Sequence, residues 1–290
     1  MKKIGLILAA LGLISSAVLA GENQLEIKKI GQELEINNTS GGEDIGEKVK
    51  FSTSVELSYQ DWIFGIEGKK EWKMDTVAGI KSRKSKFELE AIKSVNENLE
   101  LGVKFEGESD KDNYGFTYEY AKDFFISEGE FTYSAVNTGK KEERDEFEIE
   151  AEPLGFKYKD LKITWYIDYV KVLGEIPQNS EKYKLENQIR VYWDFYKSSK
   201  LDLSAEYRIG LNNKIKFSGN KIDVDEDEVK YKDFGMNAIY LSADYSVTKN
   251  LTIYGEYGYE IYNWQYINSG KTCNSEKYYG ELTLGWKYKF

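Results

Sequence analysis

Large apolar residues alternate with polar or charged residues along much of this chain. In the last stretch every second position carries a large apolar residue, namely Leu282, Leu284, Trp286, Tyr288 and Phe290. The residues between them are mostly polar. A period of two places successive side chains on opposite faces of an extended backbone. The pattern therefore predicts β-strands that each have one apolar face.

Similar stripes recur throughout the chain. They occupy residues 49–59, 62–66, 87–91, 99–105, 114–120, 131–135, 147–151, 161–169, 183–195, 201–211, 239–245, 251–261 and 278–290, with a less regular one at 25–36. This gives about fourteen strands, an even number, as single-chain bacterial barrels require. Most are expected to span roughly 10–14 residues, which is longer than the ~5–6 of globular proteins and suits a tilted membrane strand.

The expected connections alternate between short and long. The short ones are 60–61, 95–98, 121–123, 159–160, 197–200 and 248–250, and the longer ones are 38–46, 73–84, 137–144, 174–181, 212–229 and 264–275, with 109–112 as a short exception. Short turns at one end and longer loops at the other are typical of outer-membrane barrels. We therefore predict an all-β fold, a transmembrane antiparallel up-and-down β-barrel. Pro153 and Gly155 mark a change of stripe parity, which predicts a β-bulge.

The first twenty residues have the pattern of a cleaved N-terminal signal peptide. Lys2 and Lys3 precede an apolar run at 4–14, and Val18 and Ala20 provide the small residues of a cleavage site. The run is shorter than the ~20 residues of a membrane-spanning helix. We expect a signal peptide at 1–20 and a transmembrane β-barrel at 21–290, with no plug domain before the first strand.

Composition excludes several functions. The formal charge of −10 argues against nucleic acid as a partner. The chain has no histidine, which excludes a Ser-His-Asp triad and histidine-ligated zinc. Cys273 is the single cysteine, so it cannot form an internal disulfide. We expect neither an enzyme nor a cofactor or metal site.

The polar positions between the stripes are expected to face the inside of the barrel. The predicted pore-lining residues are Glu128, Glu130, Glu146, Glu148, Glu150, Lys162, Lys184, Arg190 and Arg208. Burying so many ions in a dry interior would cost several kcal/mol each, so the interior should contain water. Because acids outnumber bases at these positions, we predict a mild preference for cations.

The terminal stripe ending in Tyr288 and Phe290 resembles the C-terminal signature of bacterial outer-membrane β-barrel proteins, which their assembly machinery reads. The pattern of the whole chain is similar to the monomeric fourteen-stranded OmpG-type porins and to fusobacterial porins. This resemblance implies the outer membrane of a Gram-negative (diderm) bacterium, contacts with its lipids and with the barrel-assembly machinery, and passive diffusion of ions and small hydrophilic solutes. It also implies that the loop at 212–229 gates the pore.

Two alternatives remain open. One is a surface-exposed outer-membrane barrel that acts in adhesion or interaction through its outer loops. The other is a soluble β-sandwich whose apolar faces point inward, because alternation alone does not say which face is outside.

Overall fold

The computed structural model describes residues 25–40, 48–75, 79–136, 144–174, 181–217, 228–266, 270 and 278–290. These residues contain no helix long and apolar enough to cross a membrane. The structure contains fourteen strands over this part of the chain: β1 (Glu26–Ser40), β2 (Lys48–Tyr59), β3 (Trp62–Asp75), β4 (Gly79–Asn96), β5 (Leu99–Gly107), β6 (Lys111–Lys122), β7 (Phe125–Val136), β8 (Glu146–Tyr158), β9 (Leu161–Val172), β10 (Glu181–Lys197), β11 (Leu201–Phe217), β12 (Glu228–Ser246), β13 (Leu251–Tyr266) and β14 (Tyr278–Lys289).

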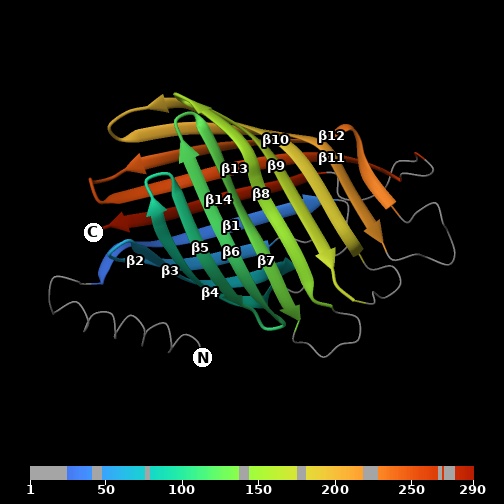
Figure 1. The fold of residues 1–290 in the computed structure, drawn as a ribbon, viewed down its shortest axis with the longest axis horizontal. Coiled ribbons are helices and arrows are strands. Elements are labelled where there is room, and N and C mark those ends of the chain that lie inside the picture. Colours follow the sequence, from blue (N-terminus) through green and yellow to red (C-terminus); the bar gives the residue numbers. More distant parts are fainter. Residues whose placement is uncertain are drawn as a thin grey trace.

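The strands close into a single barrel. Each strand pairs antiparallel with its neighbours in sequence, and β1 pairs with β14. The closing seam runs without a register shift from Lys29 opposite Lys289 to Ser40 opposite Tyr278. The short turns and the C-terminus lie at the same end of the barrel (Figure 1). The predicted fold class, an up-and-down antiparallel barrel, is confirmed.

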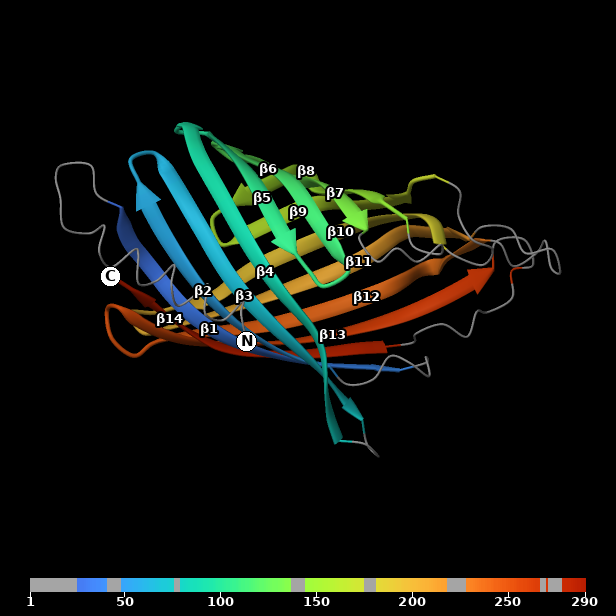
Figure 2. The ribbon, with the colours of Figure 1, turned by 90° about the horizontal axis from the view of Figure 1, so that it is seen from below.

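The wall of the barrel is uneven in height. Strand β12 has 19 residues and β13 has 16, whereas β5 has only 9. Figure 2 shows the longer strands β11–β13 reaching beyond β5–β7 at the end opposite the short turns.

Two of the predicted long connections are partly strand. The prediction of a loop at 73–84 is wrong, because β3 continues to Asp75 and β4 begins at Gly79, with Lys73 opposite Lys81. Likewise β11 continues to Phe217 and β12 begins at Glu228. The extensions of β3 and β4 are mostly polar, and in those of β11 and β12 the apolar residues Ile215, Phe217 and Val229 lie beyond a register shift, so neither pair shows a regular continuation of the apolar stripe. Their backbone hydrogen bonds nevertheless continue the sheet.

Register shifts interrupt the regular pairing at several strand pairs, among them β8 with β9 and β12 with β13. The register between β8 and β9 shifts between Ala151 and Leu154, which confirms the bulge predicted at Pro153. A larger bulge lies in β12, where the five-residue step from Tyr231 to Met236 faces the two-residue step from Trp264 to Tyr262 on β13. Both Tyr231 and Met236 are buried, so the bulge turns two large side chains to the same face.

The outside of the barrel is apolar. Large side chains at alternate positions are more than a third exposed, and they include Leu89, Val103, Phe116, Phe131, Ile163, Leu241 and Leu284. These are the apolar stripes of the sequence, and they are exposed rather than packed in a core. A contiguous exposed apolar surface of this kind is what a lipid-facing barrel requires.

Candidate functional site

The charged side chains lie on the concave face of the sheet. Several make contacts that pass over a whole strand: Lys104 on β5 reaches Glu130 on β7, at 2.5 Å between Nζ and Oε2. Tyr192 on β10 donates a hydrogen bond to Glu152 on β8 at 2.8 Å. Side chains of alternate strands converge only on the inner face of a curved sheet. These contacts therefore define the lumen.

The predicted pore-lining acids on β7 and β8 all lie on strands, and three of them pair with side chains of other strands. Glu128 Oε1 lies 3.0 Å from Lys162 Nζ, and Glu130 pairs with Lys104. Glu150 accepts a hydrogen bond from the Tyr166 hydroxyl at 2.9 Å. Glu146 and Glu148 follow at the same parity on β8, opposite Ser134 and Thr132 of β7.

One row of the lumen consists of directly opposed glutamates. In the register of β5 to β8, Glu100 faces Glu119, Glu119 faces Glu128, and Glu128 faces Glu152. Directly opposed like charges destabilise a sheet. Lys162 offsets part of this repulsion, because its Nζ lies 3.0 Å from both Glu128 and Glu152. Among the described residues, no lysine or arginine forms an ion pair with Glu100 or Glu119 in this row.

The predicted bases on β10 and β11 are neutralised by neighbouring acids. Lys184 pairs with Asp168 at 2.8 Å, and Arg208 Nε pairs with Glu206 at 2.6 Å. Arg190 lies directly opposite Arg208 in the register, and its guanidinium stacks on the Tyr166 ring with 3.3 Å between Cζ and the ring centroid. A cation over an aromatic face is stabilised by the ring quadrupole. These bases therefore form ion pairs and stacks within an acidic wall.

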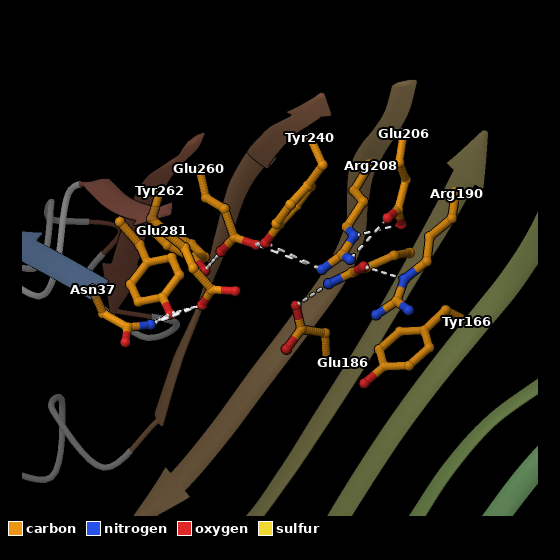
Figure 3. Close-up of polar contacts among 12 residues, drawn as sticks. Asn37, Tyr166, Glu186, Arg190, Glu206, Arg208, Tyr240, Glu260, Tyr262 and Glu281 are labelled. Carbon is orange, nitrogen blue, oxygen red and sulfur yellow. Dashed lines mark hydrogen bonds and ion pairs between the residues drawn. The ribbon is translucent and has the colours of Figure 1, made fainter. Parts of the chain in front are cut away.

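Tyrosine hydroxyls donate hydrogen bonds to acids of β13 and β14, in separate groups of contacts (Figure 3). The Tyr240 and Tyr262 hydroxyls both donate to Glu260, and the Arg208 guanidinium stacks on the Tyr240 ring. Farther along the wall, the Asn37 amide donates to Glu281 at 2.7 Å. Such shared hydrogen bonds fix side chains that would otherwise move freely in a wide pore.

A cluster of mostly aromatic side chains is buried beside these contacts. Its members are Tyr231, Met236, Ala238, Tyr240, Tyr262 and Trp264. The Tyr231 and Trp264 rings lie 4.6 Å apart between centroids, and Tyr231 donates a hydrogen bond to Glu186 at 2.8 Å. The β12 bulge, which brings Tyr231 and Met236 to the same face, creates this cluster. The sequence stripes do not reveal it, because the bulge breaks their period.

The lumen contains two hollows of opposite charge. A basic cavity of about 640 Å³ lies among β1 to β6 and is lined by eight basic and five acidic side chains. An acidic cavity of about 430 Å³ lies among β4 to β10 and is lined by seven glutamates and one arginine. The lysines of the basic cavity, among them Lys69, Lys84 and Lys86, were missed in the sequence because most lie in or beside the presumed loop at 73–84. The run of Lys and Arg at 69–86 was the available signal.

The terminal residues Tyr288 and Phe290 lie at the closing seam. Tyr288 is opposite Ile30 of β1, and the Phe290 amide donates to the Lys28 carbonyl at 3.1 Å. The two rings meet edge to face, with 5.0 Å between centroids. The last residue thus continues the pairing of β14 with β1.

Other sequence predictions fall on parts of the chain outside the described residues. These are the signal peptide at 1–20, residues 218–227 of the expected gating loop, and Cys273. Across the described ranges, no group of three His, Cys, Asp or Glu side chains is arranged to hold a metal ion.

Comparisons with known proteins agree with the fold. No family model matches the chain, and no curated protein matches it. A bacterial polysaccharide outer membrane secretin is similar in structure, with a TM-score of 0.54 and 8% identity over 93% of this chain and 100% of that chain. OmpT, an outer membrane protein of Vibrio cholerae, gives 0.46 and 10% identity over 94% of this chain and 99% of that chain. Salmonella typhi OmpF in complex with daunomycin gives a TM-score of 0.45 and 11% identity over 92% of this chain and 98% of that chain. At 8% identity, the first of these shows a shared barrel fold.

Proposed function

We propose that this chain is an outer-membrane porin that forms a water-filled channel for passive diffusion of ions and small hydrophilic solutes. One observation supports the proposal: charged side chains meet across alternate strands, as side chains on the inner face of a curved sheet do, while large apolar residues at alternate positions are exposed. A soluble sandwich would have the opposite arrangement. A barrel without catalytic motifs and with a charged interior fits a channel better than an enzyme.

The lumen needs water because its charges are too many to bury dry. The acidic cavity alone has seven glutamates, and desolvating an ion costs several kcal/mol even when it is paired. A fourteen-stranded barrel is wider than the eight-stranded barrels that side chains fill completely, and it approaches the sixteen strands of water-filled porins.

We expect a mild preference for cations. The acidic wall of β5 to β10 includes the opposed row Glu100, Glu119, Glu128 and Glu152, and its bases are already paired. A cleft lined by one sign of charge concentrates the opposite ion. Within the segment predicted to gate the channel, 212–229, residues 212–217 and 228–229 are strand, so the gating that the resemblance to OmpG-type porins implies falls to residues 218–227.

The proposed setting is the outer membrane of a diderm bacterium. Lipids would cover the exposed apolar stripes, and the barrel-assembly machinery would read the strand that ends in Tyr288 and Phe290. The seam contact of Phe290 with Lys28 supports this role, because that strand must be placed against β1 to close the barrel.

The test is single-channel recording with the refolded protein in a planar bilayer. We expect stepwise channel openings in KCl. Under a KCl gradient, the sign of the reversal potential should show that the pore prefers cations mildly. Protein that inserts but never conducts would overturn the porin proposal and favour the adhesion alternative. Failure to insert into lipid, with full solubility in plain buffer, would support a soluble fold.

A further inference from the structure

One edge of β4 is open at the end of the barrel opposite the short turns. The strand pairs with β3 as far as Gly79, which lies opposite Asp75, but it pairs with β5 only from Phe87 onward, opposite Gly107. Figure 2 shows the paired ends of β3 and β4 extending beyond β5. Residues 79–83 are all exposed. Among the residues that the structure describes, no strand pairs with this side of β4 over residues 79–83.

The turn between β5 and β6 sets the limit of the open edge. Glu108 in this turn pairs with Lys84 at 2.9 Å and with Lys86 at 2.6 Å, so the turn lies beside these two residues. Residues 79–83 lie beyond it. An exposed edge of a sheet presents unpaired N–H and C=O groups, which can pair with an extended segment of another chain.

The side chains on one face of this edge are basic. Lys48 of β2 lies directly opposite Lys73 of β3, and Lys73 lies directly opposite Lys81 of β4. Directly opposed like charges destabilise a sheet, whereas opposed unlike charges stabilise it. The row of lysines ends at Lys81 on the open edge. A strand added there would place one of its own residues opposite Lys81, and an acidic residue at that position would be favoured.

The other face of the edge is apolar at Ile80. Side chains alternate between the faces of a strand, so Ile80 lies on the face opposite to Lys81. Its side chain is 71% exposed, and covering it with an apolar residue would remove apolar surface from water. The edge therefore favours a strand in which acidic and apolar residues alternate. A second copy of this chain does not fit, because its open edge would bring basic residues against Lys81.

We propose that the open edge of β4 binds an extended acidic segment of a partner protein by strand addition, with acidic residues facing Lys81 and apolar residues facing Ile80. Backbone hydrogen bonds along residues 79–83 supply the affinity, and the two faces supply the specificity. Short turns lie on the periplasmic side of outer-membrane barrels, so the proposed setting places this edge outside the cell. The inference goes beyond the proposed porin function and does not depend on conduction.

The experiment measures binding of a fluorescein-labelled hexapeptide of alternating glutamate and valine to the refolded full-length protein in detergent micelles, by fluorescence anisotropy. We expect saturable binding. The peptide is then N-methylated at one or the other set of alternate residues. One set should weaken binding at least about tenfold and the other should not, because only one set of N–H groups in an added strand faces β4. Equal effects of the two sets would overturn strand addition.

Two further peptides test the charge and the alternation. Lysine in place of glutamate should weaken binding at least about tenfold, because like charges would then face Lys81. A peptide of three glutamates followed by three valines has the same composition, but its acids do not share one face. It should bind at least about fivefold more weakly than the alternating peptide. Equal binding of these two acidic peptides would reduce the effect to net charge and overturn the inference.

Variants of β4 locate the site. Lys81→Gln should weaken binding of the alternating peptide at least about threefold, because it removes the charge that the acids face. Lys93→Gln removes the same charge at the short-turn end of β4 and should leave binding unchanged. Equal weakening by the two variants, or no binding by a protein that conducts in bilayers, would overturn the inference and leave the porin function intact. Peptide binding by a protein that inserts without conducting would support the inference, and only the proposed function would fail.

Discussion

Lys104 and Glu130 form an ion pair across an intervening strand, with 2.5 Å between Nζ and Oε2. Lys104 lies on β5 and Glu130 on β7, so the two side chains meet over β6. Both are about three-quarters buried, at 24% and 27% side-chain exposure. A contact of this kind is possible only when the sheet curves toward these side chains.

Lys104→Gln should make the pore more selective for cations, because it leaves Glu130 unpaired beside Glu90. Glu130→Gln should shift the reversal potential in the opposite direction. The double variant should return close to the original value, since it removes one charge of each sign. Reversal potentials under a KCl gradient measure all three, and the same shift from both single variants would contradict a lumenal pair. The coupling between them in stability should be small, about 1 kcal/mol, because the pair remains partly hydrated.

Substitution by lysine should affect stability very differently at two adjacent residues of β12, Leu241 and Ser242. Leu241 is 48% exposed on the apolar outside, and Ser242 donates a hydrogen bond to Glu256 at 2.5 Å on the inside. Leu241→Lys should lower stability in lipid by about 2–4 kcal/mol if the site is near the bilayer midplane. Ser242→Lys should be tolerated, because Glu256 can pair with the new charge. Urea unfolding from lipid vesicles measures both, and equal losses would contradict the assigned faces.

Met236 is the most buried member of the aromatic cluster. Its side chain is 1% exposed and lies at the end of the β12 bulge. Met236→Ala should destabilise the barrel by about 2–5 kcal/mol, because it removes packed atoms and leaves a cavity. Met236→Leu keeps the volume and should lose less than about 1.5 kcal/mol. Thermal unfolding in detergent compares them, and a stable alanine variant would show that the cluster is loosely packed.

The contribution of Glu108 to the stability of the barrel should depend on pH. It lies between β5 and β6, and its carboxylate pairs with Lys86 at 2.6 Å and Lys84 at 2.9 Å. Burial acts to raise the pKa of Glu108, but hydrogen bonds from Lys86 and Lys84 hold that pKa below its ordinary value. A depressed pKa means that the stabilisation is present above the ordinary glutamate pKa and is lost as the pH falls through the lowered one.

The comparison of wild type with Glu108→Gln tests this pH dependence. The difference in Tm should be largest near neutral pH, decline only in the acid range and vanish when Glu108 is protonated in both folded and unfolded states. A difference that grows as the pH falls would have the wrong sign for this linkage. Glu97→Gln, at an exposed short turn, is the control and should show little pH-dependent difference.

The alternation of apolar and polar residues was enough to predict most of the strands and the class of fold. The stripe at 201–211 and the stripe at 239–245 predicted β11 and β12, and Pro153 predicted a bulge where one occurs. A period of two is a local property of the backbone, so each strand can be recognised without its neighbours. The extensions at Lys73–Asp75 and Gly79–Lys84 were missed because segments that are mostly polar show no such period.

The sequence by itself determined the strands, their alternation of faces and the classes of residue on each face. Only the tertiary structure decided which charges meet. Glu100, Glu119, Glu128 and Glu152 form one row, Lys104 reaches Glu130 over β6, and the bulge of β12 brings Tyr231 and Met236 into one cluster. These relations depend on the register between strands and on the curvature of the closed sheet. Both are set by pairing between segments far apart in the chain, which no local pattern contains.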